Sequence, residues 1–425
     1  MARSVLAAML CGLVCAAAAP AASAATPRRS LINAFGRVLA IAKHSKGSTK
    51  HEAVGAATDL AVASFPELWS TPREVVAPSL GSEVFKHSAA ALTGIKRLER
   101  SGVAGLAPTI TQIVGADRAV AQLEITQARG AGKSLLAAGD RASGAASVSR
   151  YEAAWKQAFK ALDQRVSAQV THVPTAALTA AATNALGSGQ IALQGPEILT
   201  NQPPLTLGGK PELLYIGAEG CPFCGVQRWG LIVALSQFGK FSNLHLMQSL
   251  TTEKPLVRTF TFFGSHYSSP YISFVPVEWF SNVPSGKAAP TLLQPPTPAQ
   301  QQLFDTFNQP QIFPFVDVAN GFANVGSTVR PTLVGGMSWT QIAGSLSHPS
   351  SVAAQTIGGE AEVLTAELCT ATNGQPASVC SRPIVKQYQL ALPTLDGKGG
   401  GCPATPTAVR RRGQGPQATA SRCHV

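Results

Sequence analysis

Two cysteines separated by two residues, Cys221 and Cys224, are the residues of this sequence best suited to chemistry. The apolar residues 213–216 precede them and predict a short buried strand. After them, an apolar face recurs at helical spacing and is formed by Val226, Trp229, Ile232, Val233 and Leu235. We therefore expect the pair at a strand-to-helix turn, with Cys221 at the start of the helix.

This position favours thiol–disulfide exchange. Unpaired backbone N–H groups and the helix dipole stabilise a thiolate at a helix N-terminus, and the thiolate is the form that attacks a disulfide. Pro222 suits the first helical turn, because its missing N–H costs no hydrogen bond there. We expect Cys221 to be the exposed, attacking thiol and Cys224 to resolve the mixed disulfide.

The same pair also allows two inert interpretations. One is a structural disulfide, and the other is half of a zinc site completed by Cys369 and Cys380. We prefer the redox interpretation, because a strand before and a helix after are the setting of redox-active Cys-X-X-Cys motifs. Glu219 either tunes the cysteines electrostatically or is a solvated carboxylate of the turn, and the second interpretation is the simpler one.

Length and the N-terminal residues indicate an exported protein with two domains. The chain has 425 residues, of which 45% are hydrophobic and 13% are charged, so a sizeable core is possible. A short apolar run that ends in Ala22-Ser23-Ala24 predicts a signal peptide over residues 1–24, with an uncleaved anchor as the alternative. We expect an extracytoplasmic location, either secreted or associated with the cell envelope.

The remaining cysteines fit disulfides. Six follow the predicted signal peptide, and an even number in an exported chain favours pairing. We expect Cys369 and Cys380 to form a structural disulfide that staples the polar loop between them, with a relay of electrons to the first pair as the alternative. Cys402 and Cys423 are the simplest remaining pair by proximity, although other connectivities are possible.

The chain is basic, with a net charge of +12. Its basic residues do not gather with aromatic ones, so we expect no nucleic-acid partner. Attraction to an anionic envelope surface, or plain solubility, explains the charge better. Much of the late charge lies at residues 410–412 and Arg422, in a Gly/Pro/Thr-rich stretch that predicts a flexible basic tail over residues 393–425.

The segment over residues 25–186 is rich in alanine and predicts helices. Ser149 and Glu152 have the spacing of a capping box. The helix that they would open carries an apolar stripe that we interpret as core packing, formed by Tyr151, Trp155, Phe159, Leu162, Val166 and Val170. Glycine and proline then interrupt the pattern over residues 187–210, which predicts a linker.

Strands and helices mix over residues 211–392, the expected second domain. Residues 244–248, 258–263 and 271–280 read as strands, and Thr297 caps an expected helix that ends near Asn308. Residues 312–326 predict a hairpin with an Asn-Gly turn. Helices are expected over residues 339–346 and 358–369.

This order of elements resembles the thioredoxin superfamily. Residues 218–224 look like its active-site turn, and residues 312–321 look like its cis-proline strand and hairpin. The resemblance implies an α/β, thioredoxin-like C-terminal domain, with an insertion between the Cys-X-X-Cys helix and the proline strand. It also implies that Pro314 is a cis-proline facing the cysteines and that the backbone of Phe313 binds a substrate peptide.

A closer resemblance is to a prokaryotic family named only as domain of unknown function 929, which is placed with the thioredoxin-like proteins. Residues 216–225, 314–326, 335–339 and 368–380 carry it. Because that family has no settled activity, the resemblance supports the fold more than the function.

Together these patterns predict an exported thiol–disulfide oxidoreductase that acts on protein disulfides through Cys221-Pro222-Phe223-Cys224. Its expected partners are client proteins and a redox partner, and we expect no metal. No cofactor is expected, since the sequence has no nucleotide or flavin motif. The alternative is a redox-inert binding or envelope scaffold protein with structural disulfides, in which the helical region and the basic tail make the contacts.

Overall fold

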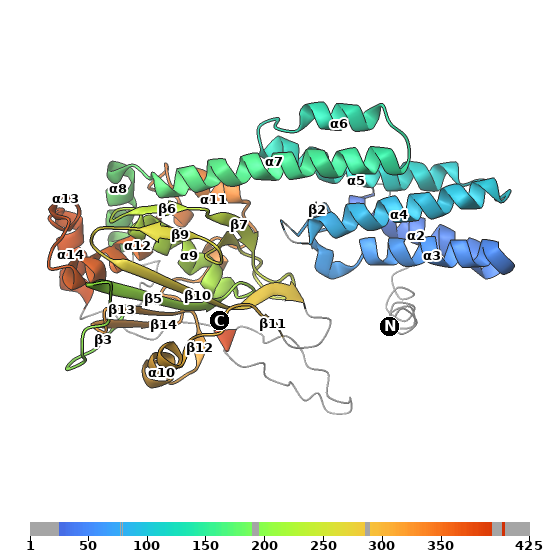
Figure 1. Cartoon of the computed structure of the whole chain (residues 1–425). Coiled ribbons are helices and arrows are strands. Elements are labelled where there is room, and N and C mark those ends of the chain that lie inside the picture. The colour runs from blue at the N-terminus through green and yellow to red at the C-terminus, as the bar shows by residue number, and fades with distance from the viewer. Residues whose placement is uncertain are drawn as a thin grey trace. The chain divides into compact units, whose positions relative to one another are not determined.

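The computed structural model describes residues 25–76, 78, 80–188, 195–284, 290–392 and 402–403, and it is a mixed α/β structure (Figure 1). Its contacts divide the chain into two compact units between Leu162 and Asp163. The expected signal peptide and nearly all of the expected tail lie outside the described residues, so the association with an anionic surface stays a prediction. No helix within the described ranges is both long and apolar enough to span a membrane.

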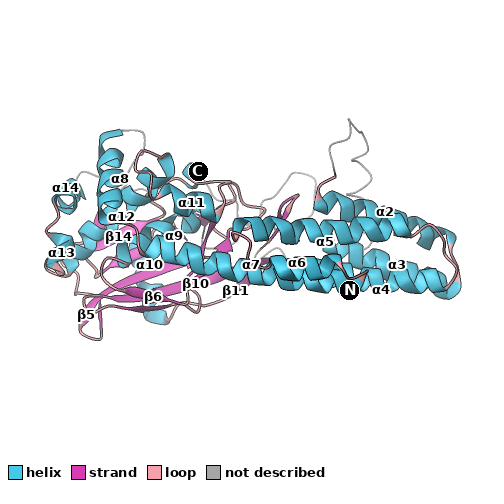
Figure 2. Cartoon of the chain, turned by 90° about the horizontal axis from the view of Figure 1, so that it is seen from above, coloured by secondary structure: helices cyan, strands magenta, loops and turns pink. Residues whose placement is uncertain are grey.

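The first unit is helical, as the sequence predicts, and one short hairpin interrupts it (Figure 2). Its elements are α2 (Pro27–His44), α3 (Gly47–Ala63), β1 (Trp69–Thr71), β2 (Glu74–Val75), α4 (Gly81–Arg100), α5 (Ala107–Gln127), α6 (Lys133–Asp140) and the first part of α7 (Ala145–Thr171). The apolar stripe of α7 is buried throughout, which confirms its interpretation as core packing.

The predicted capping box of α7 is wrong. The helix begins at Ala145, so Ser149 lies inside it, and its hydroxyl donates to the carbonyl oxygen of Ala145 at 3.1 Å. Serine in a helix interior commonly bonds back to the preceding turn in this way. Glu152 instead pairs with Lys156 at 2.6 Å along the same helix.

A mixed sheet forms the centre of the second unit, with the strand order β11-β10-β5-β13-β14-β3. Strand β5 runs parallel to β10 and antiparallel to β13, and β13 runs antiparallel to β14. These strands are β3 (Glu197–Ile198), β5 (Lys210–Ala218), β10 (Ser273–Pro284), β11 (Pro290–Leu292), β13 (Phe315–Val318) and β14 (Phe322–Val325). Apart from its first two residues, β5 is buried along its whole length, as a central strand should be.

Helices cover both faces of this sheet (Figure 1). Leu214 and Ile216 of β5 pack in the apolar cluster that contains Phe304 of α10. Tyr215 points to the other face, because side chains alternate along a strand, and its ring contacts Arg228 of α9. The helices of this unit are α8 (Thr175–Ser188), α9 (Pro222–Leu235), α10 (Pro298–Phe307), α11 (Trp339–Ser345), α12 (Val352–Ala371), α13 (Ala377–Cys380) and α14 (Pro383–Ala391).

Local signals place α10 and the following hairpin correctly. Thr297 accepts from the backbone N–H of Gln300 in a full capping box, and α10 begins directly after it. Val318 pairs with Phe322 across the predicted turn. The residues that take positive φ in this turn are Ala319 and Asn320 rather than Asn320 and its glycine neighbour.

An insertion of four short strands lies between α9 and β10. Strands β7 (His245–Gln248) and β8 (Arg258–Thr261) pair with each other, as do β6 (Lys240–Ser242) and β9 (His266–Ser268). Residues 244–248, expected as the strand that follows the Cys-X-X-Cys helix in the main fold, therefore belong to a separate hairpin. The parallel neighbour of β5 is β10, because the insertion delays the return of the chain to the sheet.

The stretch expected as a linker, residues 187–210, takes part in the second unit. It contains β3, which pairs with β14, and β4 (Thr206–Leu207), which pairs with β5. The backbone N–H of Leu205 also donates to the carbonyl oxygen of Ala319 at 3.2 Å. Backbone pairing of this kind is not visible in the glycine and proline content of the stretch.

Candidate active site

The Cys-Pro-Phe-Cys sequence forms the turn between β5 and α9, as the sequence predicts. Helix α9 begins at Pro222 with Cys221 as its N-cap, and the Cys221 sulfur accepts from the backbone N–H of Cys224 at 3.5 Å. A backbone N–H of the first helical turn therefore points at the Cys221 sulfur. Gly220, directly before Cys221, lets the turn pack closely against Leu250. A Cβ at this position would lie 2.7 Å from the Leu250 side chain.

A second segment, distant in sequence, meets this turn. The peptide bond between Phe313 and Pro314 is cis. The carbonyl oxygen of Phe313 lies 3.9 Å from the Cys221 sulfur, although 92 residues separate the two in sequence. The structure thus brings together the four residues that the sequence singled out for this site, from the start of α9 and from the chain between β12 (Ile312–Phe313) and β13.

The two cysteines of the turn are in different chemical states. Cys224 carries a free, buried thiol. Cys221 is disulfide-bonded, and its partner lies outside the residues whose side chains the structure describes. The pair is therefore not closed on itself in this structure.

Cys221 is also less accessible than expected. Only 4% of it is exposed, whereas the sequence led us to expect an exposed thiol. It packs in an apolar cluster with Phe313 and with Phe304 of α10. These side chains come from elements that no local pattern around Cys221 reveals, which is why the sequence did not predict its burial.

The electrostatics of Cys224 keep it protonated. Burial raises the pKa of the Cys224 thiol to about 12, and the positive charge of Arg228 and the backbone N–H of Ala218 act against that rise. The N–H of Ala218 donates to the Cys224 sulfur at 3.5 Å. At neutral pH the residue is therefore a thiol, and it needs to lose a proton before it can attack.

Beneath the two cysteines lies a buried ion pair that the sequence analysis missed. Arg228, one turn after Cys224 on α9, donates to both carboxylate oxygens of Glu278 on β10, at 2.8 and 2.6 Å. Both side chains are fully buried. Arg228 also donates to the carbonyl oxygen of Ala218 at 2.9 Å, and Glu278 accepts from the backbone N–H of Phe262 at 3.2 Å.

The arginine of this ion pair holds its positive charge beside the reactive turn. Burial acts against the charge of Arg228, yet Glu278 and the other groups around it more than offset this, and the pKa of Arg228 lies above its usual value. Burial raises the pKa of Glu278, and Arg228 opposes that shift. One sequence signal could have indicated the pair. Arg228 lies within a largely apolar stretch of helix, where it is expected to be buried, and a buried charge needs a partner.

The interpretation of Glu219 as a solvated carboxylate is wrong, and an electrostatic effect of Glu219 on the cysteines stays a prediction. Glu219 is buried rather than solvated. Its carboxylate accepts from the hydroxyl groups of Thr261 at 2.6 Å and Ser281 at 3.3 Å, and from the backbone N–H of Asn282 at 3.2 Å. These bonds tie the turn before Cys221 to the insertion and to β10, so Glu219 holds the shape of the site.

Aromatic side chains pack against the apolar cluster that contains Cys221. The ring of Phe313 lies 5.8 Å from that of Trp279 and 6.2 Å from that of Phe280, measured between centroids. Trp279 and Phe280 of β10 and Phe307 of α10 are partly exposed. The rim of the site is therefore apolar.

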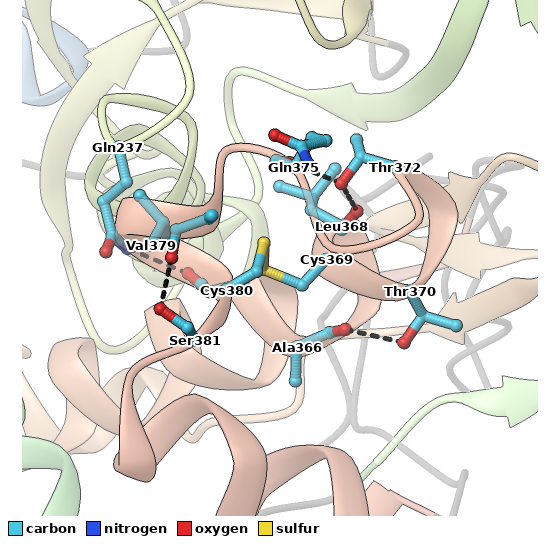
Figure 3. The surroundings of a disulfide bond; sticks show 12 residues. Gln237, Ala366, Leu368, Cys369, Thr370, Thr372, Gln375, Val379, Cys380 and Ser381 are labelled. Carbon is cyan, nitrogen blue, oxygen red and sulfur yellow. Dashed lines mark hydrogen bonds between the residues drawn. A yellow bond between two sulfur atoms is a disulfide. The ribbon is translucent and has the colours of Figure 1, made fainter.

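The other cysteine pair of the second unit forms a disulfide. Cys369, near the end of α12, is bonded to Cys380 of α13, with 5.4 Å between their Cα atoms (Figure 3). Both residues are 1% exposed. Because a disulfide offers no thiolates, these two cysteines cannot complete a zinc site with Cys221 and Cys224, and that alternative is wrong. Within the described ranges, no three His, Cys, Asp or Glu side chains cluster as metal ligands.

These features define a mixed α/β protein with a two-cysteine turn at a helix N-terminus. The family model of a domain of unknown function (DUF929) matches residues 198–285. The match includes Cys221 and Cys224 and ends before Pro314 and Cys369, so it covers only the first part of the region expected to resemble that family. No curated protein and no solved structure matches the chain.

Proposed function

We propose that the protein is an exported thiol–disulfide oxidoreductase and that Cys221 is the residue that exchanges disulfides with client proteins. The observation that carries the proposal is the 3.9 Å approach of the Cys221 sulfur to the backbone of Phe313, directly before the cis peptide bond of Pro314. A backbone edge beside a sulfur can align an extended peptide so that its own sulfur reaches Cys221.

The topology supports a thioredoxin-like fold for the second unit. In that fold the strand before the active-site turn lies between a parallel neighbour and an antiparallel one. Strand β5 has β10 as its parallel neighbour and β13 as its antiparallel one, and β14 follows at the far side of β13. The insertion of β6 to β9 then enters after α9, before the chain reaches β10.

The chain's own groups provide the parts of the reaction. A client thiolate attacks the sulfur of Cys221 in a disulfide with Cys224. The bond between the two cysteines breaks, and Cys224 leaves with the electron pair and takes up a proton. A second client thiolate then attacks the client sulfur and releases Cys221 as a thiolate at the N-terminus of α9. Two electrons pass from client to protein, and the reverse sequence reduces a client disulfide.

Arg228 and the helix N-terminus stabilise the two leaving thiolates. The positive charge of Arg228 lowers the pKa of Cys224 relative to burial alone. The N–H groups at the start of α9 act on Cys221, which is the N-cap. The apolar rim formed by Trp279 and Phe280 suits the extended, apolar segments that unfolded clients expose.

A redox-inert binding protein is the second candidate, and the burial of Cys221 is the observation that favours it. Trapping decides between the two. The full chain with Cys224→Ser is reduced, desalted and mixed with a peptide disulfide, and adducts are located by mass spectrometry. The oxidoreductase forms an adduct at Cys221 that the Cys221→Ser variant lacks. Equal labelling of the two variants would leave only the binding function.

A further inference from the structure

The chain returns to the site after α14. Strand β15 (Cys402–Pro403) pairs antiparallel with β12, and Cys402 lies directly opposite Phe313. Phe313 is the residue whose carbonyl oxygen lies 3.9 Å from the Cys221 sulfur. The strand register thus holds a second cysteine of this chain beside the backbone edge where a client peptide would pair.

The states of the other cysteines point to the same residue. Cys221 is disulfide-bonded. Cys224 is free, and Cys369 is bonded to Cys380, so none of these three is its partner. Among the cysteines of the described residues this leaves Cys402, which lies opposite the residue whose carbonyl oxygen is 3.9 Å from the Cys221 sulfur.

We propose that the C-terminal tail is an intramolecular substrate: Cys402 forms a disulfide with Cys221, and β15 occupies the edge of β12 that binds client peptides. The resting protein is then closed to clients until exchange releases the tail. This inference rests on the proposed function, since it requires Cys221 to exchange.

Closing and opening need no outside oxidant. The Cys402 thiolate attacks the Cys221 sulfur of the Cys221–Cys224 disulfide, a Cys221–Cys402 bond forms, and Cys224 leaves with the electron pair and takes up a proton. The Cys224 thiolate drives the reverse step. Because burial raises the pKa of Cys224 to about 12, its thiolate is scarce at neutral pH and the closed form persists.

A client thiolate can open the site as well. It attacks the Cys221 sulfur, and Cys402 leaves as a thiolate that takes up a proton, so one disulfide replaces another. The tail sequence suits the role: Pro403 has no N–H to donate and is tolerated in an edge strand. Only nine residues lie between Leu392 and Cys402, so the tail cysteine competes as an internal ligand.

The first test maps the disulfides of the full chain. Thiols are alkylated at lysis, and tryptic peptides are analysed without reduction. Trypsin separates Cys402 from Cys423, because residues 410–412 and Arg422 lie between them. The proposal expects the peptide over residues 399–410 linked to the one with Cys221, and Cys224 alkylated. Linkage of Cys221 to Cys224 or to Cys423 would overturn it.

The second test measures competition by the tail. The probe is a reduced fluorescent peptide with the sequence of residues 399–410, and uptake at Cys221 is compared among wild type, Cys402→Ser and the matched control Cys423→Ser. A short tether gives an effective concentration of about millimolar, so at ~10 µM probe we expect Cys402→Ser to take up ~100-fold more than wild type. Cys423→Ser should behave as wild type does.

The outcomes separate the two proposals. Equal uptake by wild type and Cys402→Ser would overturn the intramolecular substrate and leave the oxidoreductase standing. If Cys402→Ser takes up no more probe than the Cys402→Ser/Cys221→Ser double variant, Cys221 does not exchange, and both proposals fall.

Discussion

The second unit holds two disulfide-bonded regions that are equally buried and otherwise unlike. Cys221 is 4% exposed, and Cys369 and Cys380 are each 1% exposed. Cys221 lies at the N-terminus of α9, where the helix dipole favours a thiolate. Cys369 lies in the last turn of α12, where the dipole disfavours one, and Cys380 is the last residue of the single turn of α13. Burial therefore does not distinguish the two regions, whereas helix polarity does.

The surroundings of Cys221 also favour exchange more than those of the Cys369–Cys380 bond do. Cys221 lies beside the backbone edge of β12, with the Arg228–Glu278 ion pair close to its neighbour Cys224. The Cys369–Cys380 bond closes the turn between two consecutive helices, across a sequence separation of 11 (Figure 3). The first arrangement suits exchange with another chain, and the second suits stapling of a local loop.

The largest expected effect is the loss of exchange in Cys221→Ser. Without this sulfur, the adduct with a peptide disulfide at the turn should be lost, although the thiols of Cys402 and Cys423 can still react. The Cys369→Ser/Cys380→Ser double variant should keep wild-type adduct formation, measured by mass spectrometry after reduction. If the Cys369→Ser/Cys380→Ser variant lost its adducts and Cys221→Ser kept them, the roles given to the two regions would be contradicted.

The next effect concerns the ion pair beneath the site. Arg228→Met leaves Glu278 buried without its cation, and removing one partner of such a pair costs about 3–5 kcal/mol of unfolding free energy. The loss should be visible in urea unfolding. The solvent-exposed pair of Arg97 and Glu52 is the control, because Arg97→Met should cost ~1 kcal/mol or less. Equal losses in the two variants would contradict the role given to the buried pair.

Removing the staple has a smaller effect on stability. The Cys369→Ser/Cys380→Ser variant frees a short loop in the unfolded chain, which corresponds to about 3 kcal/mol in the chain-entropy description. Urea unfolding of wild type with and without reductant provides the matched measurement. An unchanged midpoint would show that the bond does not stabilise the unit.

The last expected effect is a pH dependence carried by α12, which is measured as a slope. Burial raises the pKa of Glu360 to about 8 and that of Glu362 to about 7. From about pH 4.5 to pH 8 the folded chain therefore holds protons that the unfolded chain has lost, and stability should fall as pH rises, by up to ~1.4 kcal/mol per pH unit for each proton.

The variant Glu360→Gln tests this dependence. Its amide oxygen can still accept from Gln227, as the Glu360 carboxyl does, but it cannot titrate. The fall of the unfolding free energy with pH should be shallower in this variant than in wild type. The same slope in the two proteins would rule out Glu360 as a source.

The sequence was sufficient to predict those elements that depend on neighbouring residues alone. Pro222 after an apolar strand predicted the start of α9, and Thr297 as a capping residue predicted that of α10. The capping-box pattern at Ser149 failed because helix-forming residues upstream extended α7 past it. Short motifs are therefore reliable only when the flanking residues agree with them.

The parts of the site that could not be predicted depend on contacts between distant elements. Arg228 and Glu278 are 50 residues apart, and the residues around either one do not identify the other as its partner. The hydrogen bonds of Glu219 come from β8 and β10, which no pattern near the cysteines identifies. The burial of Cys221 likewise depends on Phe313, 92 residues away.

The reduction potential of the Cys221 disulfide tests the central claim most directly. The full chain is equilibrated in glutathione buffers, and the alkylated fraction of each cysteine is measured by mass spectrometry. We expect a midpoint for Cys221 between roughly −120 and −270 mV, the span of exchange catalysts, while Cys369 and Cys380 stay bonded below about −300 mV. A Cys221 disulfide that also stays oxidised below about −300 mV would contradict the account and make both regions structural.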